Sequence, residues 1–141
     1  MSCPLCEKPQ EALYSSLHFY VIDAKDPDYP GYVRIVSTQH KKEMTDLSEE
    51  ASDAILKALV LTEKVMRDVM QPDKVNLAEF GNIVPHLHWH IIPRYQNDAH
   101  FPNSTWGERQ RTVSAEILEA RRLQTDTFFS ALKKALKSTF G

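Results

Sequence analysis

The chain has 141 residues, of which 42% are apolar and 26% are charged, and its formal net charge is −2. These values are typical of one globular domain with a hydrophobic core, and they exclude an overall basic surface for nucleic acid. The apolar runs are far shorter than the roughly 20 residues of a membrane-spanning helix. The start Met1-Ser2-Cys3-Pro4 lacks the charged and apolar regions of a signal peptide. We therefore expect a cytoplasmic protein with neither a membrane nor a nucleic-acid partner.

Several segments of the chain have the composition of β-strands, with many β-branched and aromatic residues. They are residues 13–16, 18–23, 32–37 and 74–80. Turn-forming residues fill 26–31, so we expect the second and third segments to pair antiparallel. Before the fourth, Ser48 has the position of an N-cap, and apolar residues recur at helical spacing until Pro72 ends the pattern.

The last third of the chain predicts a loop followed by helix. Residues 97–107 are rich in turn formers and read as loop, and 112–124 have a weak helical periodicity. Phe129, Leu132 and Leu136 share one helical face, with Thr125 as a candidate N-cap. Strands near both ends of a long central helix predict an α+β domain built on an antiparallel sheet.

The run His86-Leu87-His88-Trp89-His90 alternates histidines with apolar residues. Because strand side chains alternate between faces, a strand here would place all three histidines in one row and send Leu87 and Trp89 into a core. Such a row predicts either a metal site or a phosphate-handling site, since histidine is a common metal ligand and changes charge near pH 7. Gly81, in the turn before the run, favours the phosphate interpretation because exposed turn amides bind anions.

The two cysteines of the chain form the sequence Cys3-Pro4-Leu5-Cys6. In a reducing compartment this spacing suggests metal binding or redox chemistry before a disulfide. A thioredoxin-like site needs a preceding strand, which the position near the N-terminus does not provide. The spacing alone leaves half a zinc site and a pair of inert thiols as equal alternatives.

The histidine run resembles the motif of the histidine-triad (HIT) family, His-φ-His-φ-His-φ-φ, at every position. The segment Gly81-Asn82-Ile83-Val84-Pro85 is similar to the one that precedes the triad in many members, and the resemblance extends from Cys3 to about Trp106. It is closest to a bacterial branch described as diadenosine-polyphosphate hydrolases. The resemblance implies a HIT-like fold with a five-stranded antiparallel sheet and one long central helix, with residues 1–107 as the HIT domain and 108–141 as a C-terminal helical extension packed on it.

The resemblance also implies a chemistry and roles for the three histidines. His88 would attack the α-phosphorus of a purine nucleotide polyphosphate or a related conjugate, forming a nucleotidyl-histidine that water resolves to a nucleoside monophosphate. We expect a backbone carbonyl to hold one nitrogen of His88 and leave the other free. His90 would contact phosphate oxygens, and His86 completes the triad.

Nucleotide-binding positions follow from the same resemblance. Asn82 and the amides near Ile83 and Val84 would contact phosphate. Asp23, with Asp28 as the alternative, would bind the ribose, and Asn76 or Glu79 would line the phosphate side. Two positions depart from the family pattern. Many members have Ser or Thr where this chain has Ile83, which has no proton for a leaving group, so we expect anhydride rather than phosphoramidate substrates. Tyr32 stands where many members have histidine, and it cannot titrate near pH 7.

Some bacterial members bind zinc through ligands that match Cys3, Cys6, His40 and His86, so the resemblance implies a closed structural zinc site. The chemistry itself needs no metal. Relatives pair two sheets into a continuous homodimer, and we expect the same here. Two functional alternatives remain: a nucleotide-binding or sensing module with little turnover, and a zinc enzyme that uses the triad histidines as ligands.

Overall fold

The computed structural model describes residues 3–141, so the expectation that rests on Met1 and Ser2 lies outside the described residues. Its sheet has five antiparallel strands in the order β1-β2-β3-β5-β4. The strands are β1 (Tyr14–Ser15), β2 (Phe19–Asp23), β3 (Val33–Ser37), β4 (Lys74–Ala78) and β5 (His88–Arg94). The predicted α+β class and antiparallel sheet are confirmed, whereas the fourth strand ends two residues before the predicted Phe80.

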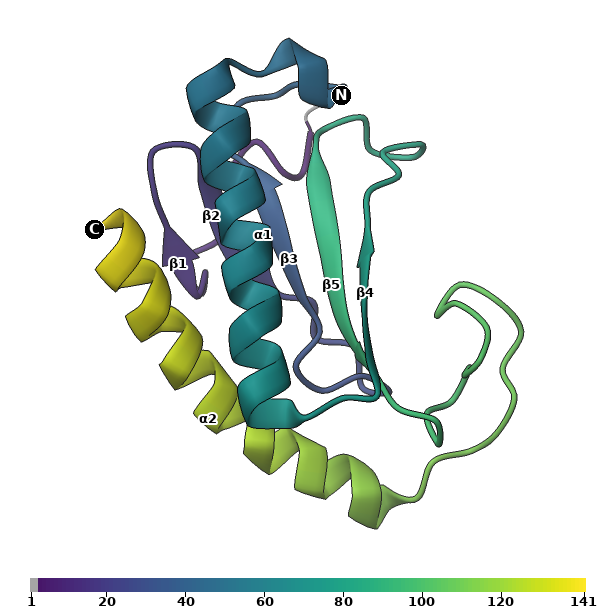
Figure 1. The fold of residues 1–141 in the computed structure, drawn as a ribbon. Helices are drawn as coiled ribbons and strands as arrows, with labels where there is room; N and C mark the ends of the chain where they lie inside the picture. The colour runs from purple at the N-terminus through teal and green to yellow at the C-terminus, as the bar shows by residue number, and fades with distance from the viewer. Residues whose placement is uncertain (1–2) are drawn as a thin grey trace.

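Helix α1 (Glu49–Met70) follows a short 3₁₀ turn, η1 (Met44–Asp46), and crosses one face of the sheet (Figure 1). The predicted N-cap is confirmed, because Ser48 Oγ accepts a hydrogen bond from the Ala51 amide at 3.1 Å. The buried side of α1 repeats at helical spacing and packs on the helix-facing side chains of the sheet. The members of α1 in this core are Ala51, Ile55, Ala58, Leu59, Met66 and Met70.

Helix α2 (Ala115–Phe140) runs beside α1 and reaches β1 (Figure 1). Its residues Phe128, Leu132 and Leu136 are fully buried in the same core as α1. The predicted cap at Thr125 is wrong, since the N-cap of the helix lies eleven residues earlier, at Ser114, whose Oγ accepts from the Ile117 amide at 3.2 Å. Thr125 lies inside the helix and donates its hydroxyl to the Arg121 carbonyl. The division of the chain near residue 107 stays a prediction.

Alternation along the strands separates the two faces of the sheet. Trp89 and Ile91 of β5 join the core under α1, so His88 and His90 point to the opposite face. There the register sets His90 opposite Arg34 of β3 and Ala78 of β4. Neither helix within residues 3–141 carries an apolar stretch long enough to cross a membrane.

Candidate active site

The β5 strand begins at His88, so His86 is outside it. The expectation of one row of three histidines is therefore wrong for His86. The ladder between β3 and β5 ends at the pair Val36–His88, and the chain turns there, with the His86 amide bonded to the Val84 carbonyl at 2.8 Å. The side chain of His86 is fully buried and belongs to a second group of residues, whereas His88 and His90 share one face.

The imidazole of His88 has one nitrogen held by backbone. Its Nδ1 lies 2.7 Å from the carbonyl oxygen of His86. A carbonyl oxygen can only accept, so Nδ1 carries the proton and the neutral ring has a lone pair on Nε2. His88 is half-buried and lines a pocket. This geometry is that of a neutral imidazole whose free nitrogen can act as a nucleophile or as an acceptor.

His90 has a different partner, the hydroxyl of Tyr32, which lies 2.6 Å from its Nδ1. Arg34, on the same face of β3, places its guanidinium carbon 5.7 Å from the centroid of the Tyr32 ring. Burial, followed by the electrostatic effects of His88 and Arg34, lowers the pKa of His90 to about 4. Burial raises the pKa of Tyr32 against the opposing effect of Arg34. At neutral pH His90 is therefore an uncharged ring and Tyr32 a protonated phenol.

The two histidines open onto a pocket of about 490 Å³. Its wall combines the turn between β4 and β5 with one residue of the loop after β5. The lining residues are Phe80, Gly81, Asn82, Ile83, Val84, His88, His90 and Trp106. Phe80 and Trp106 meet edge to face with ring centroids 4.9 Å apart, and Trp106 also lies edge-on to His90 at 5.0 Å. The pocket thus sets two imidazoles beside aromatic rings and the turn between β4 and β5, which combines apolar walls with a few polar groups, as in small-molecule sites.

A buried ion pair holds the loop that carries Trp106. Arg94, the last residue of β5, bonds Asp98 through Nε at 2.8 Å and through Nη2 at 3.1 Å, and its Nη2 also donates to the Asn103 carbonyl at 2.7 Å. Burial alone would raise the pKa of Asp98, but hydrogen bonds from Arg94 and from the Tyr95 and Phe101 amides outweigh it and lower the pKa to about 2. Arg94, at the end of β5, therefore ties the loop to the sheet at Asp98 and at Asn103.

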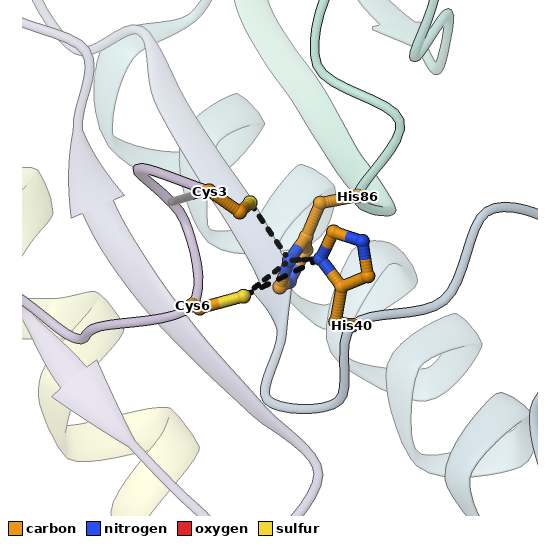
Figure 2. Close-up of side chains that lie close together, drawn as sticks. All are labelled: Cys3, Cys6, His40 and His86. Atoms are coloured by element: carbon orange, nitrogen blue, oxygen red, sulfur yellow. Dashed lines mark hydrogen bonds between the residues drawn. The ribbon is translucent and has the colours of Figure 1, made fainter. Parts of the chain in front are cut away.

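Beside the pocket, Cys3, Cys6, His40 and His86 turn their donor atoms toward one another (Figure 2). These four atoms all lie within 4.8 Å of one another. The closest pairs are His40 Nδ1 to His86 Nδ1 at 3.1 Å, Cys6 Sγ to His40 Nδ1 at 3.3 Å and Cys3 Sγ to His86 Nδ1 at 3.4 Å. A tetrahedral zinc with bonds of about 2.0–2.3 Å separates its ligand atoms by roughly 3.3–3.8 Å. The donor set and spacing fit that ion.

The hydrogen bond of the other nitrogen of His86 also favours a bound zinc ion. Nε2 lies 2.7 Å from the Ser37 carbonyl oxygen and must carry the proton, which leaves the lone pair on Nδ1 facing the cysteines. A carbonyl partner on the second nitrogen is the usual arrangement for a metal-bound histidine. In residues 3–141 this is the one group of three or more potential ligands close enough to hold a metal, and it excludes His88 and His90. The arrangement does not fit a zinc ion held by all three triad histidines.

Comparison with known proteins identifies the family. The family model described as the HIT domain matches residues 6–97. The chain belongs to the HIT family. A bis(5'-adenosyl)-triphosphatase of Saccharomyces cerevisiae is 33% identical over 93 residues, which is 62% of this chain and 45% of the yeast protein. The chain thus matches less than half the length of that curated relative.

Solved structures of HIT proteins share the fold. A histidine triad protein from Bradyrhizobium japonicum is 27% identical, with a TM-score of 0.71 and 88% of each chain covered. A zinc-bound histidine triad family protein from Mycobacterium smegmatis is 20% identical, with a TM-score of 0.58 over 93% of this chain and 98% of that one. The predicted HIT resemblance and HIT-like fold are confirmed.

The HIT pocket brings together most, but not all, of the predicted site residues. Asn82, Ile83 and Val84 line it with His88 and His90. Asp23 does not, because it pairs with Val33 in register and shares the helix-facing side of β2 with Phe19 and Val21. Its Oδ1 accepts from the Lys25 amide at 2.8 Å, and it lines a separate pocket next to α2. Asp23 therefore lies outside the histidine pocket, and its role toward the ribose stays a prediction.

Asn76 is on the histidine face but is engaged elsewhere, since its Oδ1 accepts from Arg94 Nη1 at 2.7 Å. It therefore extends the network that holds the Trp106 loop and does not line the HIT pocket. Sequence reasoning gave no role to Phe80, which the predicted strand included. Its position could have indicated the pocket, because Phe80 is an aromatic residue directly before Gly81 of the motif segment. The strand has already ended there, at Ala78.

Proposed function

We propose that this HIT protein is a nucleotide hydrolase or transferase that attacks the α-phosphate of a purine nucleotide polyphosphate through His88. The observation that carries the proposal is the 2.7 Å hydrogen bond from His88 Nδ1 to the His86 carbonyl, which leaves the Nε2 lone pair at the pocket. The adenosine-specific description of the yeast relative supports a purine nucleotide substrate.

In the first step, the Nε2 lone pair of His88 forms a bond to the α-phosphorus, and the bond from phosphorus to the leaving oxygen breaks with its electron pair remaining on the leaving group. In the second step, a water oxygen bonds to phosphorus, the nitrogen–phosphorus bond breaks, and the proton of the water passes to solvent. The products are a leaving phosphate and a nucleoside monophosphate. Asn82 and the amides of Ile83 and Val84 are placed along the pocket wall, where they can donate to phosphate oxygens.

The identity of Ile83 bears on the leaving group. Its side chain is 95% exposed at the pocket mouth and offers no proton. A phosphate leaves without protonation near pH 7, whereas an amine does not. The substrate class proposed is therefore a phosphoanhydride. The same residue favours the second candidate, a nucleotide-binding module with little turnover.

We propose further that Cys3, Cys6, His40 and His86 hold a structural zinc ion. The support is the donor spacing, which fits a tetrahedral site, and the Ser37 carbonyl that orients His86. The ion would supply a closed cross-link between the N-terminal segment and the residues that precede β5. None of the steps at His88 passes through it.

We also propose a homodimer. The outer edge of β4 is unpaired within the described chain, and Leu77 on it is exposed. An uncovered edge strand is a template for pairing with another copy. Light scattering coupled to gel filtration distinguishes a mass near 32 kDa from the 16.2 kDa of one chain.

The decisive experiment mixes the protein with diadenosine triphosphate, diadenosine tetraphosphate and an adenosine phosphoramidate, followed by intact-mass and product analysis. We expect AMP from the anhydrides and an adduct of one AMP on the protein. His88→Ala abolishes both, whereas His18→Ala leaves both unchanged, because the His18 side chain meets Glu50 of α1 and does not line the pocket. Tight nucleotide binding without product or adduct would instead support the binding module.

A further inference from the structure

The three triad histidines each have one ring nitrogen fixed, but by different partners. His86 and His88 donate to backbone carbonyls, of Ser37 and His86 respectively. His90 meets the Tyr32 hydroxyl, a group that can either donate or accept. The direction of this hydrogen bond decides which nitrogen of His90 carries its proton and therefore what His90 presents to the pocket.

The surroundings of Tyr32 determine that direction. Its side chain is buried, and in residues 3–141 its hydroxyl has no partner other than His90 that could take its proton. Arg34 is next to it, but a guanidinium has only donors. If Tyr32 accepted from His90, its own buried proton would lack an acceptor, which is unfavourable for a buried hydroxyl. The hydroxyl therefore donates to Nδ1.

We propose that Tyr32 is a positioning residue that fixes His90 as the neutral tautomer with its proton on Nε2, facing the pocket. His88 and His90 then present opposite functions to one bound phosphate. His88 offers a lone pair to phosphorus, and His90 offers an N–H to a phosphate oxygen. The tautomer itself follows from the contacts of Tyr32, whereas its role toward phosphate rests on the proposed function.

The charged and titratable groups that face His90 agree with a neutral ring. They are Tyr32, which immediately precedes β3, Arg34 of β3 and His88 of β5, and none is a carboxylate that would favour a cationic imidazole. From the other two sides the neighbours are the uncharged rings of Phe80 and Trp106. His90 consequently acts as a hydrogen-bond donor rather than as a fixed positive charge.

Nitrogen-15 NMR of histidine-labelled protein at pH 7 tests the proposal without any turnover. We expect a protonated-type shift for His90 Nε2 and an unprotonated-type shift for Nδ1. In Tyr32→Phe both shifts move toward the average of two tautomers. The matched control is Tyr95→Phe. Tyr95 also has an arginine over its ring, and its hydroxyl donates to the Met70 carbonyl and not to His90. There the His90 shifts stay as in the native protein.

Kinetics supply the second readout. We expect Tyr32→Phe to lower kcat for AMP release by about tenfold, the value of one hydrogen bond, with little change in KM. If Tyr32 acts through His90, it has no further effect in a His90→Gln background, within about twofold. A native His90 protonated on Nδ1, unchanged shifts in Tyr32→Phe, or additive losses in the double variant would each overturn the proposal. An inactive native protein with the expected shifts would overturn the proposed function but not the tautomer.

Discussion

The carbonyl oxygen of His86 accepts the Nδ1 proton of His88 at 2.7 Å, while the side chain of His86 faces Cys3 and Cys6. One residue therefore contributes its ring to the cysteine–histidine cluster and its backbone to the proposed nucleophile. The two sites are adjacent but have separate functions. Variants of the cysteine–histidine cluster should therefore change zinc content, and variants of His88 should change activity.

Replacing a cysteine should remove the metal without removing the chemistry. For Cys6→Ser we expect zinc to fall from about one per chain to a small fraction, and the free energy of unfolding to fall by about 2–4 kcal/mol. Elemental analysis and urea unfolding measure the two effects. A chelator should lower the stability of the native protein but add nothing in Cys6→Ser. Full zinc retention in that variant would point to ligands elsewhere.

Replacing the proposed nucleophile should remove the activity and leave the metal in place. We expect His88→Ala to lower AMP release by at least about a thousandfold, as for other covalent catalysts, with zinc content unchanged. Its melting temperature should stay within a few degrees of the native value because His88 is only half-buried. Measurable adduct in His88→Ala would show that another residue attacks.

Alternation and capping rules account for most of the fold and part of the site. They predict the antiparallel sheet, the Ser48 cap and the core positions of Leu87, Trp89 and Ile91, all of which the structure contains. They fail for His86 because a period of two holds only while the strand continues, and the ladder ends at His88. The approach of Cys3 and Cys6 to His86 is a tertiary contact, so spacing alone left it open.

The positions of Asp23 and Thr125 have local causes. The same alternation that places His88 on the open face puts Asp23 on the opposite face of the sheet, where it pairs with Val33. Thr125 is a plausible cap by residue type, but the helix continues on its N-terminal side, where Arg121 is buried against the sheet-end loop and supplies the carbonyl that Thr125 bonds. Neither could be inferred without the packing partners.

The C-terminal helix should unfold together with the sheet. Leu132 is fully buried in the common core, so we expect Leu132→Ala to lower the free energy of unfolding by about 2–5 kcal/mol. Leu123, exposed on the same helix, is the matched control, and Leu123→Ala should change it by less than about 0.5 kcal/mol. Urea unfolding followed by circular dichroism tests both. Two separate transitions would indicate an independent extension.

The ion pair under the Trp106 loop should be far more sensitive than a surface pair. We expect Asp98→Asn to cost about 3–5 kcal/mol, because it leaves the buried Arg94 charge without its partner. Asp28→Asn, which removes the exposed partner of Arg109, should cost at most about 1 kcal/mol. Thermal or urea unfolding compares the two. Equal effects would contradict the structural role given to Arg94.

Stability should depend on pH through His90. Its pKa is lowered to about 4 in the folded protein, whereas an unfolded histidine titrates near 6.5, so between these values the unfolded chain binds more protons. The stabilising contribution is present above pH 6.5 and is lost as the pH falls toward 4. His90→Gln should show a shallower decline of unfolding free energy between pH 7 and pH 5. An identical slope in both proteins would contradict the lowered pKa.

The two tryptophans of the chain lie in opposite environments. Trp89 is 5% exposed in the core, whereas Trp106 is 53% exposed at the pocket beside His90. A molecule entering the pocket changes the surroundings of the second indole and leaves the first untouched. The protein thus carries an optical reporter of occupancy, and emission from Trp106 offers a way to screen for its natural ligand before any reaction is known.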